Sequence, residues 1–253
     1  RAIFVLDKTP FYGEGGGQVG DIGTVTSDNF EIDIIDTKKT SKGIVLMIGD
    51  VTSGIAKVSS DVHTEIDVKR RNNIRRNHSV THLLHKALKE VLGNHVNQAG
   101  SLVRDDYMRF DFTHFEAISQ EDLKKIEEIV NKEIFRALPV ETIITNPKEA
   151  AKLGAVGLFE EKYGDIVRVV KMGDFSIELC GGTHVKNTSE IGMFKILQEG
   201  GISSGVRRVE CITGPAVYKY LNENLEQIDR ISKLVKANKS EIEHKIETTQ
   251  NEL

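Results

Sequence analysis

Four side chains that commonly bind metals occur as two pairs with the same spacing. His78 and His82 are four residues apart, and so are Cys180 and His184 much later in the chain. Three imidazoles and one thiolate are the number and kind of ligands that a tetrahedral zinc ion takes. Either pair alone would be weak evidence, because histidines recur at this spacing by chance. Together the pairs predict a metal site, and the fold must then bring two distant segments to one point.

The first pair lies in a segment with helical periodicity. We expect Asn77 to cap the start of this helix and Gly93 to end it, with apolar residues recurring every three or four positions between them. His78 and His82 then lie one turn apart on one face, opposite most of the aliphatic side chains. That face should present imidazoles to a cleft, with His85 as a cleft wall or an outer neighbour of the ligands.

The second pair follows a segment, residues 175–179, that alternates like a strand. Gly181 and Gly182 lie between the ligands and should allow a tight or left-handed backbone. Such a turn can fold Cys180 and His184 toward one point. The competing interpretation is a buried histidine pair and an unrelated buried cysteine.

The composition is that of an ordinary globular protein. The chain has 253 residues, 39% of them hydrophobic and 28% charged, enough for a sizeable core and two domains. No apolar stretch is long enough for a membrane helix, and no signal peptide opens the chain. Two cysteines are too few for a disulfide framework. With Cys180 assigned to the metal and Cys211 reduced in a strand, we expect a cytoplasmic protein.

Cations are concentrated immediately before the histidine pair, although the net charge is −4. Residues 69–76 contain five cations in eight positions. The candidates for RNA contact in this run are Arg70, Arg71, Arg75 and Arg76. Such a run is usually a solvated face, but its position beside a metal cleft favours contact with phosphates. Arg207 and Arg208, after the glycine-rich residues 200–205, are a second candidate, with a simple turn before a strand as the alternative.

Short apolar runs separated by turn residues predict an all-β domain over residues 1–70. The expected strands are Ala2–Leu6, Gly23–Thr26, Glu31–Ile35, Gly43–Ile48 and Val62–Val68. A small β-barrel would hide their edges. The domain contains a glycine-rich loop, residues 10–21, which is no P-loop because neither Gly-Lys-Ser/Thr nor a helix follows it. We expect a shaped loop that presents the Gln18 amide to a neighbouring site.

Residues 71–213 mix helices and strands without regular βαβ alternation, which predicts an α+β domain with helices on a mostly antiparallel sheet. Ser119 should cap a helix that runs to Ala137. The expected strands are Tyr107–Phe112, Pro139–Thr145, Ile166–Met172, Phe175–Cys180, Met193–Gln198 and Val206–Thr213. Residues 214–253 predict a long C-terminal helix whose apolar seam packs on a partner partly outside this segment.

These segments, taken in order, resemble the editing region of the alanyl-tRNA synthetase family. The matching stretches are residues 9–12 with 16–21, residues 77–85, residues 109–112, residues 180–185 and residues 205–210. They extend over residues 1 to about 215, and their combined specificity is high. Gly15 departs from the family pattern, which more usually has a small polar residue there.

The resemblance implies a hydrolase that removes serine or glycine from mischarged tRNA(Ala), acting at the CCA end of the acceptor arm. The ligands that it implies for one zinc ion are His78, His82, Cys180 and His184. It implies editing roles for Thr81 and Gln18 and a barrel before the editing core. It also implies an N-terminal aminoacylation domain and a C-terminal oligomerisation domain in the full-length protein, so this segment should not charge tRNA.

Several interpretations stay open at this point. The chain could instead be a free-standing trans-editing protein, although its start at Arg1 and its unfinished terminal helix argue against that. It could also be a structural zinc module that only binds RNA, or a metal-free hydrolase with Cys180 as the nucleophile. The Thr81 hydroxyl is expected to bond a seryl hydroxyl that alanine lacks. The alternative for Thr81 is a bond to the carbonyl one helical turn earlier.

Overall fold

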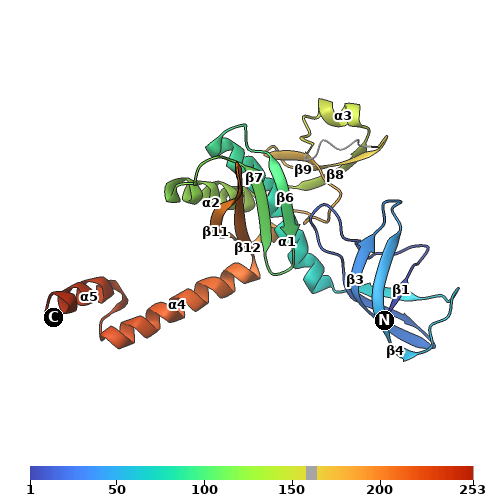
Figure 1. Cartoon of the computed structure of the whole chain (residues 1–253), viewed down its shortest axis with the longest axis horizontal. Helices are drawn as coiled ribbons and strands as arrows, with labels where there is room; N and C mark the ends of the chain where they lie inside the picture. Colours follow the sequence, from blue (N-terminus) through green and yellow to red (C-terminus); the bar gives the residue numbers. More distant parts are fainter. Residues whose placement is uncertain (158–163, 253) are drawn as a thin grey trace. The chain divides into compact units, whose positions relative to one another are not determined.

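The computed structural model describes residues 1–157 and 164–252 (Figure 1). Contacts divide the chain into two compact units, Arg1–Gly214 and Pro215–Leu253, which are described separately below. Among the described residues, no helix is both long enough and apolar enough to cross a membrane. The helices and the mostly antiparallel sheets agree with the predicted α+β class.

The first sheet of unit one is five-stranded and antiparallel, with the strand order β1-β4-β3-β2-β5. Its strands are β1 (Ala2–Phe4), β2 (Gly23–Ser27), β3 (Phe30–Lys39), β4 (Val45–Gly54) and β5 (His63–Ile66). Alternation on β3 directs Ile32 and Ile34 into a core that also contains Phe11 and Met47. Each expected strand is present, with its ends shifted. Hydrogen bonding to the neighbouring strands, rather than local composition, decides where a strand ends. The closure of this sheet into a barrel stays a prediction.

A second antiparallel sheet has the order β11-β12-β7-β6. Its strands are β6 (Gln98–Val103), β7 (Met108–Thr113), β11 (Phe194–Ser203) and β12 (Val206–Thr213). Helices α1 (Val68–Leu92) and α2 (Gln120–Phe135) contact each other and pack against this sheet (Figure 1). The shared core includes Leu83, Phe110 and Ile126, all fully buried. Strand β6 was not expected, because most of its residues are small or polar and it is held by backbone pairing with β7.

A third, smaller sheet has the order β10-β9-β8 and carries the second half of the metal motif. Its strands are β8 (Val140–Thr145), β9 (Val167–Met172) and β10 (Ser176–Leu179). Cys180 follows β10 directly. The short helix α3 (Pro147–Lys152) lies between β8 and β9 in the sequence and was not predicted.

Helix α1 starts ten residues earlier than the sequence suggested. Its N-cap is Asp67, whose carboxylate accepts a hydrogen bond from the backbone N–H of Arg70 at 2.8 Å. The expected cap, Asn77, is instead buried within the helix, where its amide donates to the carbonyl of Arg104 at 2.8 Å. The cationic run therefore forms the first turns of the ligand helix, because nothing between Asp67 and Asn77 breaks a helix. Gly93 ends the helix as expected.

The Ser119 cap of α2 is confirmed, since its hydroxyl accepts from the N–H of Asp122 at 3.0 Å. In unit two the single long helix is wrong. Helix α4 (Pro215–Val235) ends before Lys236, which has a left-handed φ of 52°. A 3-10 turn (Lys239–Glu241) then leads into α5 (Ile242–Asn251), which contacts α4.

Candidate metal centre

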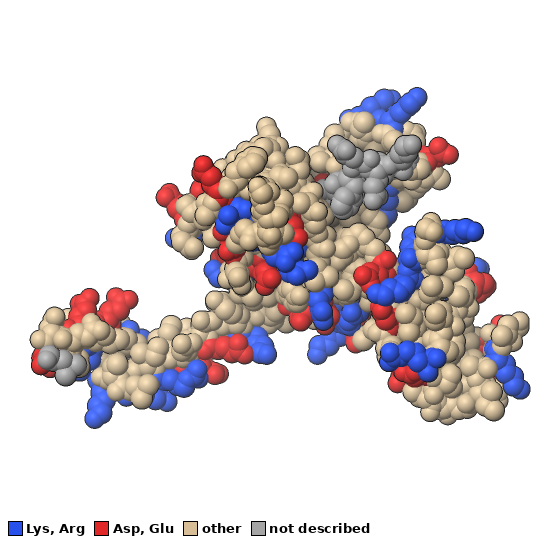
Figure 2. All heavy atoms as spheres, in the orientation of Figure 1, with Lys and Arg blue, Asp and Glu red and all other residues tan. Residues whose placement is uncertain are grey.

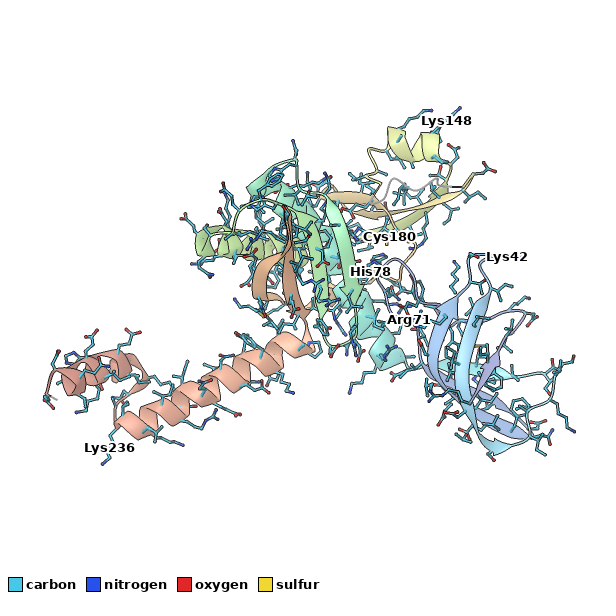
Figure 3. The ribbon with its side chains drawn as sticks, in the orientation of Figure 1. Lys42, Arg71, His78, Lys148, Cys180 and Lys236 are labelled. Carbon is cyan, nitrogen blue, oxygen red and sulfur yellow. The ribbon has the colours of Figure 1, made fainter. Side chains whose placement is uncertain are left out.

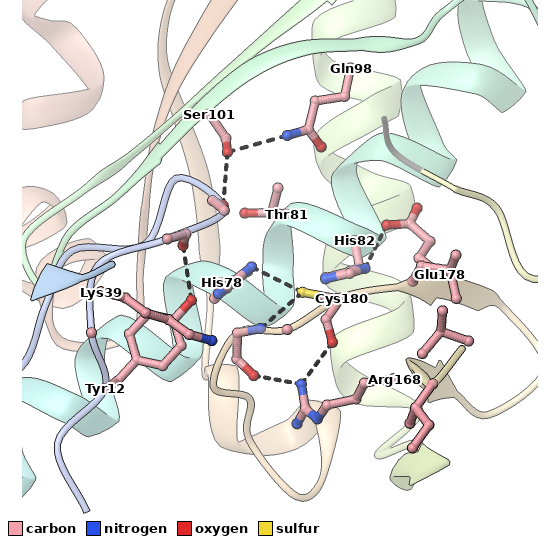
Figure 4. Close-up of a pocket in the computed structure, with 18 residues that line it drawn as sticks. Tyr12, Lys39, His78, Thr81, His82, Gln98, Ser101, Arg168, Glu178 and Cys180 are labelled. Atoms are coloured by element: carbon pink, nitrogen blue, oxygen red, sulfur yellow. Dashed lines mark hydrogen bonds and ion pairs between the residues drawn. The ribbon is translucent and has the colours of Figure 1, made fainter. Parts of the chain in front are cut away.

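The four predicted ligands meet at one point. One nitrogen or sulfur atom from each of His78, His82, Cys180 and His184 lies within 4.8 Å of the others. The Cys180 Sγ is 3.4 Å from His78 Nε2 (Figure 4) and 3.3 Å from His184 Nε2. Ordinary Zn–N and Zn–S bonds in a tetrahedral site hold nitrogen and sulfur about 3.5 Å apart. The residues present therefore fit a zinc ion in both chemistry and spacing.

Polar partners orient two of the imidazoles. Gln18 Oε1 lies 2.7 Å from His78 Nδ1 and accepts hydrogen bonds from the backbone N–H and hydroxyl of Thr183 at 2.9 and 3.2 Å. Ser79 Oγ lies 3.1 Å from His184 Nδ1. With both Nδ1 atoms engaged, the Nε2 atoms remain for a metal, which is how outer neighbours usually select the ligating nitrogen. Gln18 also joins the helix half of the site to the turn half.

Glu178 performs the same task for the third imidazole. Its Oε2 lies 2.6 Å from His82 Nδ1, and its Oε1 lies 2.8 Å from His85 Nδ1. All three side chains are buried. His85 thus shares the carboxylate with His82 and lies outside the ligand set. Sequence reasoning missed Glu178, although its position two residues before Cys180 on a strand places both side chains on one face.

Burial and neighbouring charges shift the pKa values of the ligands. Burial alone would raise the pKa of the Cys180 thiol, but His78 and His82 hold it well below its usual value. Burial and His78 lower the pKa of His184 to about 3. Burial would also lower the pKa of His82, but Glu178 and Cys180 outweigh it and raise that pKa to about 10. Cys180 would therefore offer a metal a thiolate and His184 a neutral imidazole, and His82 would have to release a proton to bind it.

The turn brings Cys180 and His184 together as expected, but not through a left-handed backbone. Neither Gly181 nor Gly182 has a left-handed φ. Gly182 is required for space instead, because a Cβ there would lie 1.9 Å from the Cε1 atom of His78. Close approach of backbone to an imidazole is thus the reason for this glycine.

The glycine-rich loop delivers Gln18 through a two-residue hairpin turn. Gly15 and Gln18 exchange backbone hydrogen bonds of 3.0 and 3.1 Å, and the central residues Gly16 and Gly17 have φ of 57° and 81°. Two consecutive left-handed residues are what a type I′ turn needs. The carbonyl of Gly17 accepts from the N–H of Val103 at 2.8 Å, which attaches the loop to β6. The expected shaped loop is therefore present.

A buried ion pair anchors the same loop to α1. Arg71 Nε donates to Asp21 Oδ1 at 2.8 Å, and Asp21 Oδ2 accepts from the backbone N–H of Tyr12 at 2.6 Å. Arg71 also donates to the carbonyl of Pro10 at 2.9 Å, and Arg70 to that of Gly20 at 2.8 Å. Figure 3 shows Arg71 near the start of α1, below His78. Arg71 thus stabilises the contact between the glycine-rich loop and α1.

The other candidate arginines also have partners within the protein. The pairs are Arg75 with Asn72, Arg76 with the carbonyl of Glu190, Arg207 with Glu199, and Arg208 with Asp111. On the face shown in Figure 2, Lys and Arg are interspersed with Asp and Glu. RNA contact through these arginines stays a prediction.

A cavity of about 360 Å³ opens onto the cluster. Its wall brings together the glycine-rich loop, α1, β6, β9 and the Cys180 turn, and includes Tyr12, Lys39, His78, Thr81, His82, Gln98, Ser101, Arg168, Cys180 and Gly182 (Figure 4). The Thr81 hydroxyl donates to the carbonyl of Asn77 at 2.8 Å, the alternative weighed for it. Its oxygen can still accept a hydrogen bond from the cavity. Gln18 is not among the described residues that form this wall.

Sequence comparison identifies the class of protein that this chain resembles. Residues 167–210 match the family described as the threonyl and alanyl tRNA synthetase second additional domain, and residues 1–70 match class II (A) tRNA synthetases. Two separate stretches of unit one thus match models of aminoacyl-tRNA synthetases.

Matches along nearly the whole of this chain are more specific. The chain is 54% identical to the alanine--tRNA ligase of Clostridioides difficile, over 95% of this chain and 29% of that protein. It is 52% identical to the alanine--tRNA ligase of Pelotomaculum thermopropionicum, over 96% and 28%, and 52% identical to that of a Thermoanaerobacter species, over 98% and 28%. The resemblance to the alanyl-tRNA synthetase family is therefore confirmed. The chain spans less than a third of the length of these curated relatives.

Proposed function

We propose that unit one hydrolyses the ester of Ser-tRNA(Ala) and Gly-tRNA(Ala), and so edits mischarged tRNA within a longer alanine--tRNA ligase. The carrying observation is that three of the four clustered ligands, His78, His82 and Cys180, face one cavity. The similarity to alanine--tRNA ligases supports the proposed substrate, the aminoacylated CCA end of tRNA(Ala). We also propose that the protein is cytoplasmic and that this segment does not itself charge tRNA.

Zinc is the proposed metal, because three imidazoles and a thiolate suit it better than they suit magnesium or calcium. When bound by these residues, zinc would supply a Lewis acid for the ester carbonyl or an anchor for the substrate. Four protein ligands normally complete a tetrahedral site. The residues of the cavity wall must therefore orient the ester and the attacking water.

Thr81 is proposed to select the substrate. Its hydroxyl proton is engaged by Asn77, so its oxygen acts toward the cavity as an acceptor. A seryl hydroxyl can donate to that oxygen, whereas an alanyl methyl group cannot. A polar site that expects a hydroxyl discriminates strongly against a substrate without one. Correctly charged Ala-tRNA(Ala) would then be spared. Glycine also lacks a hydroxyl, so the proposed hydrolysis of Gly-tRNA(Ala) does not depend on this contact.

Gln18 is proposed to act through His78 rather than on the substrate. Its oxygen accepts from both halves of the metal site. Its Nε2 is buried and has no hydrogen-bond partner among the described residues. A residue so placed holds the ligand ring in one orientation, which is a positioning role.

Deacylation assays test the proposal. The protein should release serine from Ser-tRNA(Ala), a chelator should abolish the release, and added zinc should restore it. Full activity in the metal-free protein would exclude the metal role.

Absence of hydrolysis with zinc bound would indicate a structural zinc module that only binds RNA, and a trapped acyl-enzyme on Cys180 would indicate covalent catalysis. Thr81→Val should lose the preference for Ser-tRNA over Ala-tRNA, and unchanged selectivity contradicts its role.

A further inference from the structure

Arg168, on strand β9, lies beside the turn that carries the cysteine ligand. We propose that Arg168 is a positioning residue that holds the turn from Cys180 to Gly182 in its metal-binding conformation. This inference rests on the metal centre proposed above and assigns a task to a residue that no sequence motif singled out. It makes Arg168 an outer support of the site, acting through the backbone of its ligand.

The Arg168 guanidinium donates three hydrogen bonds that support this positioning role. Arg168 Nη1 donates to the carbonyl of Cys180 at 2.9 Å and to the carbonyl of Gly182 at 2.7 Å (Figure 4). Its Nη2 donates to the Thr142 hydroxyl at 3.2 Å, which fixes the guanidinium to the neighbouring strand β8. Both hydrogens of Nη1 are thus used to span the two ends of the turn.

The backbone of Arg168 contributes a further contact to the same turn. Its carbonyl accepts from the N–H of Cys180 at 3.0 Å. The cysteine is therefore held on both sides of its Cα by one residue. Because β9 and β10 pair in antiparallel register, this contact continues the sheet directly into the ligand.

Among the described residues, the turn has two other supports: Gln18, which accepts from Thr183, and a bond from the Gly182 N–H to Cys180 Sγ at 3.4 Å. Gly181 has no side chain and faces open space, with no described atom within 4 Å of where its Cβ would be. Gly182 packs its backbone against the His78 ring, so a small movement there changes two ligands at once. Metal–ligand distances tolerate changes of only about 0.2 Å. Geometry of this precision needs a rigid support, which the guanidinium supplies.

A lysine cannot replace this support fully. The planar guanidinium presents donors in a fixed fork, whereas an ammonium is a single flexible point. One ammonium could reach one or both carbonyls but could not also hold Thr142 in the same plane. Arg168→Lys should therefore keep the charge and lose much of the positioning.

The test measures zinc affinity by competition with a coloured chelator, for the wild type and for Arg168→Gln and Arg168→Lys. Arg136→Gln is the matched control, because Arg136 also donates through both terminal nitrogens, to Glu133 at 2.6 Å and Asp174 at 2.9 Å. Loss of an outer neighbour typically weakens metal binding by about 10- to 100-fold. We expect that loss in Arg168→Gln, a smaller one in Arg168→Lys, and a change below about twofold in the control.

Cobalt(II) gives a second measurement, since its thiolate charge-transfer absorption reports the Cys180 bond directly. That band should weaken or shift in Arg168→Gln and stay unchanged in Arg136→Gln. If Arg168→Gln does not fold, Thr142→Val, which removes the anchor of Nη2, should still weaken zinc binding severalfold. Wild-type affinity in Arg168→Lys and Thr142→Val would then overturn the proposal.

The outcomes separate this inference from the proposed function. A wild-type protein that binds zinc, together with an Arg168→Gln variant of equal affinity, overturns the positioning role alone. In that case slower deacylation by the variant would mean that Arg168 acts on the substrate from the cavity wall. Weakened zinc binding in a protein that never hydrolyses Ser-tRNA(Ala) supports the positioning role and refutes the proposed function. Failure of the wild type to bind zinc overturns both.

Discussion

Replacing Gly182 with alanine should destroy the metal centre by displacing one ligand. The new Cβ would lie 1.9 Å from His78 Cε1, 2.3 Å from His78 Nδ1 and 3.0 Å from Gln18 Oε1. Carbon atoms ordinarily approach to about 3.5 Å, so the ring or the turn must move by roughly 1.6 Å. The φ of Gly182 is not left-handed, so the effect would be steric overlap and not backbone strain.

The surroundings leave little room for this movement. Arg168 holds the carbonyl of Gly182, and Gln18 holds the His78 ring. A displacement of roughly 1.6 Å far exceeds the distance error of about 0.2 Å that a metal ligand tolerates. We therefore expect His78 to be lost as a ligand and zinc affinity to fall by about 100-fold or more, at or above the largest effect of an outer neighbour. Overpacking should also destabilise the metal-free protein by about 1–3 kcal/mol.

The neighbouring glycine is the control. A Cβ on Gly181 meets no described atom within 4 Å, and its φ is also not left-handed, so Gly181→Ala should bind zinc as the wild type does. Chelator competition measures affinity, and thermal unfolding with and without EDTA separates metal loss from instability. Wild-type zinc affinity in Gly182→Ala, or an equal loss in Gly181→Ala, would refute the reasoning.

Three further predictions follow from the same geometry. Glu178→Gln removes the carboxylate that helps raise the pKa of His82 to about 10, so zinc binding near neutral pH should release fewer protons, by up to about one. Because the His82 proton must leave when zinc binds, the zinc affinity of the wild type should fall as pH falls. Calorimetry in buffers of different ionisation enthalpy measures the number of protons released. An equal number in Glu178→Gln and the wild type would contradict the role of Glu178 at His82. In the metal-free protein iodoacetamide should modify Cys180, whose pKa is lowered, and should spare Cys211. Burial and the charge of Glu127 raise the pKa of the Cys211 thiol. Peptide mass mapping identifies the modified cysteine, and bound zinc should protect Cys180. Ser119→Ala should lower the free energy of unfolding by about 1 kcal/mol through loss of the α2 cap, measured by urea denaturation, and no change would argue against that cap.

Helices and strands differ in how well the sequence predicted them. The Ser119 cap and the Gly93 stop were correct, because each depends on a side chain or a φ angle at the position itself. The start of α1 was wrong, because Asp67 and Asn77 are equally good caps locally. Only tertiary packing distinguishes them, since burial commits the Asn77 amide to contacts elsewhere in unit one.

The cationic run illustrates a different limit. Its charges are plain in the sequence, but their partners are not. Arg71 is buried against Asp21, which comes from a loop far away in the chain. The cationic run that suggests an RNA-binding face therefore includes an arginine that stabilises the contact between the glycine-rich loop and α1. Distance in sequence hides such a pair, because no local pattern links the two residues.

The sequence by itself identified the four side chains that come together in the candidate metal centre, because imidazole and thiolate chemistry and the helical repeat are local properties of His78, His82, Cys180 and His184. Only the tertiary structure decided how those ligands are held. The partners of the imidazole Nδ1 atoms, Gln18, Ser79 and Glu178, come from three separate elements, and Arg168 supports the turn from a fourth. Orientation of a ring depends on hydrogen bonds between segments that meet only when the chain folds, so spacing along the chain cannot specify it.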